Sequence, residues 1–155
     1  MSEAASAAEA VRATALRLLG RREHTHRELR EKLTRRGYDA AEVDVVLAGL
    51  VEEGWLDEAR FAEAFVRSRI ERGQGPVRIE QEMRQRGVPR SMIEQALAAA
   101  AADWREQACK VRRHRFGTPV PADRREAARQ AQFLQRRGFT AAQVRAAVAA
   151  ADEDD

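Results

Sequence analysis

The chain carries one short signature three times, at intervals of about fifty residues. Each copy has an apolar residue, a glycine four positions later with two arginines between them, and an apolar or aromatic residue directly after the glycine. The copies are Leu33-Thr34-Arg35-Arg36-Gly37-Tyr38, Met83-Arg84-Gln85-Arg86-Gly87-Val88 and Leu134-Gln135-Arg136-Arg137-Gly138-Phe139. Self-similarity at such a period is typical of proteins that stack one helical unit repeatedly. An array of this kind presents a long surface, which favours recognition over catalysis.

The three copies also agree beyond the signature. Counted from each glycine, apolar residues recur six and ten positions later, a spacing that places them on one face of a helix. They are Val43, Ile93 and Val144 at the first offset, and Leu47, Leu97 and Val148 at the second. The agreement establishes the repeat.

Helix boundaries are legible in the sequence and predict an all-α fold. Four capping boxes, in which a side chain accepts from the amide three residues on, mark helix starts at Thr25, Asp39, Asp103 and Thr140. Further starts are expected at Asp57, Pro76 and Pro89, with the prolines in the first helical turn. The helices before Gly37, Gly87 and Gly138 are expected to end on a left-handed glycine. The nine expected helices span 7–20, 26–36, 40–53, 58–73, 77–86, 90–101, 104–116, 123–136 and 141–151.

These helices group into three units of three, in an elongated array. The predicted domains are residues 1–54, 55–102 and 103–151, followed by an acidic tail at 152–155. Aromatic residues make up 5% of the chain and charged residues 34%, a composition that argues against one large core. The third unit departs from the others, because it has a proline-bearing loop at 117–121 and Gln130 at the offset of Leu29 and Ile79. Its core is therefore expected to be thinner.

Charge is concentrated in the third unit. Residues 103–151 carry 11 basic and 4 acidic side chains, a net charge of +7, whereas the first two units are almost neutral. A basic region of this kind is typical of a protein that meets a polyanion or an acidic protein groove.

The residue inventory argues against an enzyme and against a bound cofactor or small-molecule substrate. The three histidines have no metal-ligand spacing, Cys109 is the only cysteine, and no glycine-rich phosphate loop is present. No secretory segment opens the chain and no apolar run approaches the roughly 18 residues of a membrane span. We expect a soluble cytoplasmic protein with no membrane contact.

The segment from Gly54 to Ala62 is the densest in distinctive residues. Asp57 is expected to cap a helix, Arg60 to pair back to Asp57, and Phe61 to be buried. Leu56 and Trp55 lie on the connection between units, where Trp55 is expected to plug the joint or, alternatively, to stack on a nucleic-acid base. His24 and His26, beside the cap at Thr25, are expected to face solvent.

Several of these stretches, in order, resemble the RecX family of bacterial proteins that modulate the recombinase RecA. The resemblance covers about residues 13 to 148, and its most specific part is Trp55-Leu56-Asp57 followed by Arg60-Phe61-Ala62. The other matching stretches are Arg22-Glu23-His24-Thr25, Glu28-Leu29 with Lys32-Leu33, Gly73-x-Gly75-Pro76-x-Arg78-Ile79, Arg86-Gly87-Val88, Phe116-Gly117 and Arg136-Arg137-Gly138-Phe139. Within this motif set, Trp55, Leu56, Asp57, Arg60, Phe61, Gly75, Pro76, Gly37, Gly87 and Gly138 are expected to be structural.

The resemblance implies a curved, elongated array that lies in the groove of the RecA filament on DNA and bridges neighbouring protomers. We expect the free protein to be a monomer. It implies inhibition of filament extension, ATP hydrolysis, strand exchange and co-protease activity, with no cofactor. Whether the protein caps the filament, blocks its groove or actively disassembles it is left open.

Arginine suits such a partner, because its planar fork binds carboxylate or phosphate at two points. The candidate contacts to the RecA filament and, weakly, to DNA are Arg67, Arg69, Arg72 and Arg78 in the middle unit, and Arg112, Arg113, Arg115, Arg124, Arg125 and Arg129 in the third. In the middle unit, interspersed glutamates allow the alternative of a solvated, internally paired face.

Two alternative functions remain at this stage. The first is an autonomous DNA-binding protein without sequence specificity, and the second is a generic helical-repeat scaffold for another protein. The segments 40–53 and 141–151 offer mostly alanine and valine where a recognition helix needs polar base-reading side chains.

Overall fold

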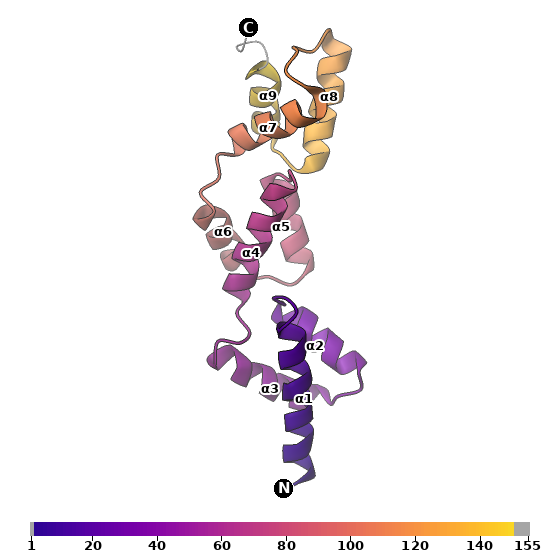
Figure 1. The fold of residues 1–155 in the computed structure, drawn as a ribbon, viewed down its shortest axis with the longest axis vertical. Helices are drawn as coiled ribbons and strands as arrows, with labels where there is room; N and C mark the ends of the chain where they lie inside the picture. The colour runs from indigo at the N-terminus through magenta and orange to yellow at the C-terminus, as the bar shows by residue number, and fades with distance from the viewer. Residues whose placement is uncertain (1, 151–155) are drawn as a thin grey trace.

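The computed structural model describes residues 2–150, and within that range the chain forms nine helices and no strands. Figure 1 shows them stacked along one long axis. They are α1 (Glu3–Leu19), α2 (His26–Arg35), α3 (Ala40–Glu52), α4 (Glu58–Glu71), α5 (Pro76–Gln85), α6 (Arg90–Ala99), α7 (Trp104–Phe116), α8 (Arg124–Arg137) and α9 (Ala141–Ala150). The predicted all-α class is confirmed. The predicted tail at 152–155 lies outside the described residues.

Helix ends follow the sequence signals. The side chains of Thr25, Asp39 and Asp103 each accept from the amide three residues on, and Thr140 and Gln143 cap each other reciprocally. The glycines of the three signatures have φ angles of 93°, 88° and 100°, in the left-handed region that only glycine adopts without strain. One detail differs, because Pro89 precedes α6 as its N-cap and is not part of the first turn.

Each unit has its own apolar core. Leu33, Met83 and Leu134, the first residues of the three signatures, are completely buried in the first, second and third cores. Within the described residues the third core has five buried members, against nine in each of the others. The predicted thinner core of the third unit is therefore confirmed.

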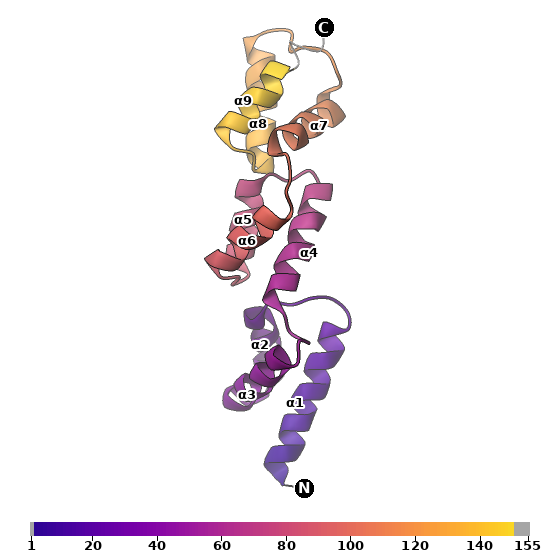
Figure 2. The ribbon, with the colours of Figure 1, turned by 90° about the vertical axis from the view of Figure 1, so that its left-hand side faces the viewer.

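The three units are α1–α3, α4–α6 and α7–α9, and both views show them placed one above the next (Figures 1 and 2). Leu56 belongs to the first core, and Trp104 packs against both the second and the third. In the sequence, each of these two residues stands two positions after a predicted domain limit, at 54 and 102. Those limits and the curvature of the array stay predictions.

The second helices of successive units meet end to end. At the joint between units 2 and 3, here called joint 2, the amide of Gly75 donates to the carbonyl of Arg137 (2.7 Å) and that of Val77 to the carbonyl of Gly138 (2.9 Å). A Cβ on Gly138 would lie only 2.3 Å from the Cβ of Arg78. The positive end of the α5 dipole therefore faces the negative end of α8, and each helix end satisfies backbone groups of the other.

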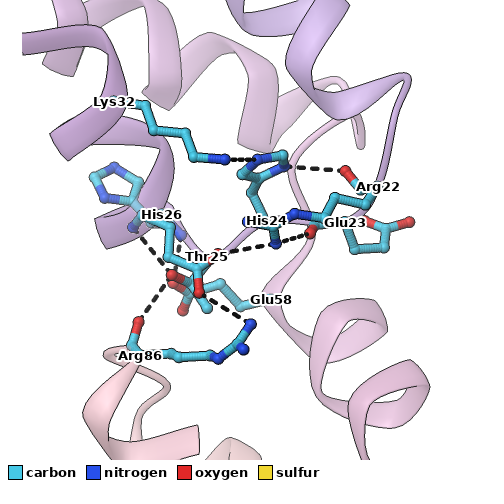
Figure 3. A network of polar contacts seen from close by, with 9 residues as sticks. Arg22, Glu23, His24, Thr25, His26, Lys32, Glu58 and Arg86 are labelled. Carbon is cyan, nitrogen blue, oxygen red and sulfur yellow. Dashed lines mark hydrogen bonds and ion pairs between the residues drawn. The ribbon is translucent and has the colours of Figure 1, made fainter. Parts of the chain in front are cut away.

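Joint 1, between units 1 and 2, is built on the same plan (Figure 3). The Thr25 hydroxyl donates to the carbonyl of Arg86 at the end of α5 (2.8 Å), and the amide of His26 donates to the Glu58 carboxylate (2.9 Å). Gly87 packs against an arginine side chain of α2. Two joints of one kind thus hold the three units in line.

Candidate interaction surface

The third unit presents arginines stacked on aromatic rings. Phe116 of α7 and Phe133 of α8 meet edge to face, with ring centroids 5.3 Å apart. The Arg115 guanidinium lies over both rings, that of Arg129 over Phe116 (5.4 Å) and that of Arg137 over Phe133 (5.2 Å). We call these five residues the arginine–phenylalanine cluster. Stacking fixes each guanidinium plane and leaves N–H edges free for phosphate or carboxylate.

The arginines of this cluster differ in how far they are already paired. Arg129 makes two hydrogen bonds to the Glu126 carboxylate, at 2.9 and 3.0 Å. This contact lowers the pKa of Glu126 and raises that of Arg129. Arg137 donates to the carbonyl of Arg72 across joint 2 (3.2 Å). Arg115 is exposed and has no ion pair within residues 2–150. It is therefore the cluster member best placed to meet a partner.

Arg112 requires a correction, because the structure places it inside the third unit. Its side chain is 2% exposed and donates from Nε to Gln130 Oε1 (2.9 Å) and from Nη2 to the carbonyl of Pro119 (2.7 Å). Gln130 is buried as well, at 3% exposed. Gln130, the polar residue at an apolar position of the repeat, thus has Arg112 as its buried partner. The Arg112 side chain holds the 117–121 loop and does not face outward.

The other third-unit candidates are accessible. Arg113 is half-exposed and pairs with Glu106 (3.2 Å). Arg124 and Arg125 are exposed on the first turn of α8, at the end of that helix opposite joint 2. Of the predicted third-unit arginines, Arg112 is therefore buried, and the others lie at the surface of the protein.

The middle-unit candidates do not form one free rim. Arg69 and Arg78 both bind Glu82 (3.1 Å each), and Arg69 also lies over Phe65. Burial lowers the pKa of Arg69. Arg67 and Arg72 are exposed. Half of this group is therefore engaged within the protein, as the alternative of an internally paired face requires.

The residues of the Trp55 segment are placed partly as expected. Leu56 is 1% exposed and closes the first core. Phe61 is buried in the second core, where its ring stacks on that of Phe65 with the centroids 5.7 Å apart. Trp55 is 55% exposed, and the expectation that it plugs the joint is wrong. Asp57 caps α4 through the amide of Arg60 (3.0 Å).

Arg60 also differs from its expected role. Its guanidinium binds the Glu23 carboxylate of unit 1 (2.6 Å) and the carbonyls of Gly54 and Trp55 (3.2 Å each), and does not pair with the carboxylate of Asp57. It therefore connects α4 to the first unit, which explains a structural role for this arginine.

His24 is a further correction, because it is 1% exposed and does not face solvent. Its Nδ1 lies 3.0 Å from the carbonyl of Arg22 and its Nε2 lies 2.9 Å from Nζ of Lys32 (Figure 3). A carbonyl only accepts and an ammonium only donates, so the ring is neutral with its proton on Nδ1. Burial, reinforced by the positive charge of Arg22, lowers its pKa below the usual value.

Acidification is expected to weaken the first unit through His24. An unfolded histidine has a pKa near 6.5, so as the pH falls below about 6.5 the unfolded chain binds a proton that folded His24 resists. The free energy of unfolding should therefore decrease from pH 7.5 to pH 5.8, and less so in His24→Gln. Urea titrations at both pH values check this, with His26→Gln as control. Equal pH dependence in wild type and His24→Gln would remove His24 as the titrating group.

A groove of about 780 Å³ runs along joint 2, between α5 on one side and α8 and α9 on the other. Its apolar lining includes Val77, 41% exposed, with Phe139 and Val144 buried beneath. Arg136 and Arg145 are exposed at its edge. We call it the joint 2 groove.

The sequence reasoning missed the aromatic half of the cluster and the arginines of this groove. One signal was available, because Arg129, Phe133 and Arg137 follow at intervals of four, which places them on one face of a helix. The groove had no such local signal, since its two walls come from different units.

Two negative findings apply to residues 2–150 alone. Within this range no group of three or more His, Cys, Asp or Glu side chains is arranged to hold a metal ion. None of the helices in it combines the length and the apolar character that a bilayer crossing requires.

The sequence and fold of this chain are similar to those of known proteins over nearly its whole length. Models of the first, second and third three-helix domains of RecX match residues 12–50, 57–97 and 103–148. Regulatory protein RecX of Halorhodospira halophila is 70% identical over 155 residues, covering 100% of this chain and 96% of the relative. Regulatory protein RecX of Pseudomonas savastanoi pv. phaseolicola is 48% identical over 84% of each chain.

Solved structures agree on the architecture. The crystal structure of RecX from Lactobacillus salivarius superposes with a TM-score of 0.84 at 19% identity, covering 96% of this chain and 99% of that chain. A likeness at this identity shows the shared three-unit fold. Since the family models match most of the chain, and in the order of its three units, the chain belongs to the RecX family of regulatory proteins.

Proposed function

We propose that this protein is a negative modulator of RecA that binds in the groove of the RecA–DNA filament and bridges neighbouring protomers. There it inhibits filament extension, ATP hydrolysis, strand exchange and co-protease activity, and thereby restrains DNA repair, recombination and the SOS response in the cytoplasm. The proposal rests on family membership together with one observation, a three-unit array whose last unit, with 11 basic and 4 acidic side chains, has a net charge of +7.

The geometry supports inhibition by binding to the filament alone, without a chemical reaction. The joints fix the units in line, joint 2 through backbone hydrogen bonds and joint 1 through the Thr25 hydroxyl and the Glu58 carboxylate, so the array can span several sites on a regular polymer as a monomer. Guanidinium groups held on aromatic rings lose little conformational freedom when they bind. A protein that lies along a filament in this way blocks protomer movement without hydrolysing anything itself.

Two exposed valines of α3 bear on the alternative of autonomous DNA binding. Val45 and Val51 are exposed on this helix, 74% and 50% respectively, where a base-reading helix would carry polar side chains. Binding to bare duplex DNA is therefore expected to be weak, sensitive to salt and indifferent to sequence.

Titration of the protein into RecA that hydrolyses ATP on single-stranded DNA tests the proposal. Turnover should fall at well below one inhibitor per protomer. Reversing the charge of Arg115, Arg124 and Arg125 together should raise the half-inhibitory concentration about tenfold or more, equivalent to ~1.4 kcal/mol of binding. These residues replace Arg112, whose burial makes it unsuitable for such a test.

The matched control reverses Arg35, Arg84 and Arg90, which are exposed on the first and second units. It should inhibit like wild type, and circular dichroism should report unchanged helicity for both variants. Equal inhibition by the two variants would show that the third-unit arginines do not contact the filament. Pulldowns with filaments, free RecA and bare DNA would then separate the remaining alternatives.

A further inference from the structure

The two joints are built alike, so joint 1 serves as an internal reference for the surface at joint 2. Counted from the signature glycines, Val77 at joint 2 corresponds to Arg27 at joint 1. Arg27 lies on α2, pairs with Glu31 on the same helix (3.4 Å), and covers Gly87 with its aliphatic part. At joint 2 the corresponding glycine, Gly138, lies instead against Arg78 in the first turn of α5, and Val77, at the position of Arg27, remains 41% exposed in the groove.

The opposite wall of the groove, formed by α9, also differs from its counterpart at joint 1. Ala141 and Arg145 of α9 correspond to Arg90 and Glu94 of α6. At joint 1, Arg90 and Glu94 form an ion pair at 3.1 Å, which satisfies that surface internally. At joint 2 the shorter alanine opens the groove, and arginine in place of glutamate changes the net charge of these two positions from zero to +1.

Among residues 2–150, the groove therefore has a positive edge without a free counter-charge. No carboxylate within residues 2–150 forms an ion pair with Arg136 or Arg145. Glu82, the one carboxylate that lines the groove, is already bound by both Arg69 and Arg78. An apolar centre with a charged edge is the arrangement of a protein-binding site, whereas a phosphate backbone offers nothing to an exposed valine.

We propose that the joint 2 groove binds an acidic segment of a partner protein, with one apolar side chain seated on Val77 and flanking carboxylates on Arg136 and Arg145. The apolar side chain gains by leaving water, and the two guanidinium groups fix its orientation and select against basic segments. The inference rests on the proposed function only in taking the filament protein as the source of that segment.

A direct binding measurement on the full chain tests the groove without RecA. The probe is a fluorescein-labelled peptide with one leucine between two pairs of glutamates, and anisotropy reports its binding. We expect a Kd of about 10–100 μM, in the range of weak peptide contacts. Arg136→Glu combined with Arg145→Glu should weaken binding about tenfold or more, and Val77→Asp should do the same.

Arg84→Glu combined with Arg90→Glu changes the net charge equally and should leave peptide binding unchanged. A peptide with serine in place of leucine should bind more weakly than its parent. Equal loss in both double variants, or no loss in either, would overturn the proposal. So would displacement of the peptide by oligothymidine with the same dependence on Arg136 and Arg145, which would make the groove a nucleic-acid site.

Two results keep a failure here apart from a failure of the proposed function. A groove variant that loses the peptide yet inhibits RecA normally would leave the regulator intact and remove the filament protein as the source of the segment. Neutralising Asp152, Glu153, Asp154 and Asp155 should leave peptide affinity unchanged. A gain of about tenfold or more would instead identify the chain's own tail as the occupant and overturn the proposal.

Discussion

Gly138→Ala is expected to uncouple the third unit from the rest of the array, whereas Gly37→Ala is expected to leave the array intact. Both glycines have positive φ angles, so alanine costs about 1–2 kcal/mol of backbone strain at either position. At Gly37 nothing lies within 4 Å of the added methyl group, and strain is the whole effect. Gly37→Ala therefore measures the cost of backbone strain alone.

At Gly138 the methyl group would also lie 2.7 Å from the backbone nitrogen of Arg78 and 2.3 Å from its Cβ. These atoms belong to the first turn of α5, which cannot rotate away as a long side chain can. The joint must open, with loss of the two backbone hydrogen bonds that Gly75 and Val77 donate. At about 1 kcal/mol each, the total cost becomes ~3–4 kcal/mol, against ~1–2 kcal/mol for Gly37→Ala.

Trp104 provides the readout, since it packs against both the second and the third core. In a Trp55→Phe background it is the sole tryptophan. Gly138→Ala should then unfold in two steps in urea, because nearest-neighbour coupling holds a linear array together. A single transition, displaced no further than in Gly37→Ala, would show that the end-to-end joint contributes little to coupling. Gly87→Ala should fall between the two, because the atoms it meets belong to the flexible Arg27 side chain.

The sequence predicted the units better than the joints, for a physical reason. Capping at Thr25, Asp39 and Asp103 involves residues three positions apart, so each signal lies within one short segment. The joints bring together Thr25 with Arg86 and Gly75 with Arg137, which are about sixty residues apart. No local rule encodes such a contact, although the recurrence of glycine at these ends was visible.

The errors at single residues share one cause, since residue type or sequence neighbourhood was used where packing in three dimensions decides. Trp55 was expected to plug the joint because it is an aromatic residue beside a helix cap, and His24 to face solvent because it neighbours the cap at Thr25; the structure has Trp55 exposed and His24 buried. Arg112 stands in a run of basic residues, yet it lies one turn after Ala108, and both are buried. The joint 2 groove could not be predicted at all, because it depends on how two units are placed against each other.

Arg112→Ala is expected to destabilise the third unit by about 3 kcal/mol, far more than the neighbouring Arg113→Ala. Removing a buried guanidinium leaves a cavity and deprives Gln130 Oε1 and the Pro119 carbonyl of their donors. Arg113 is half-exposed and has one ion pair, so its removal should cost less than about 1 kcal/mol. Urea unfolding followed by Trp104 fluorescence measures both.

Loss of the Arg112 side chain should also disturb the surface of the third unit, because Arg112 is the buried end of a series of hydrogen bonds that reaches this surface. Gln130 donates to Glu126, which in turn holds Arg129 in the arginine–phenylalanine cluster. Arg112→Lys keeps the charge but cannot reach Gln130 and Pro119 with one fork, so it should recover only part of the stability. Full recovery by lysine would show that the charge alone matters, and equal costs for Arg112→Ala and Arg113→Ala would show that the guanidinium does not hold the loop. Loss of stability together with weaker RecA inhibition would tie the buried arginine to the binding surface that it supports.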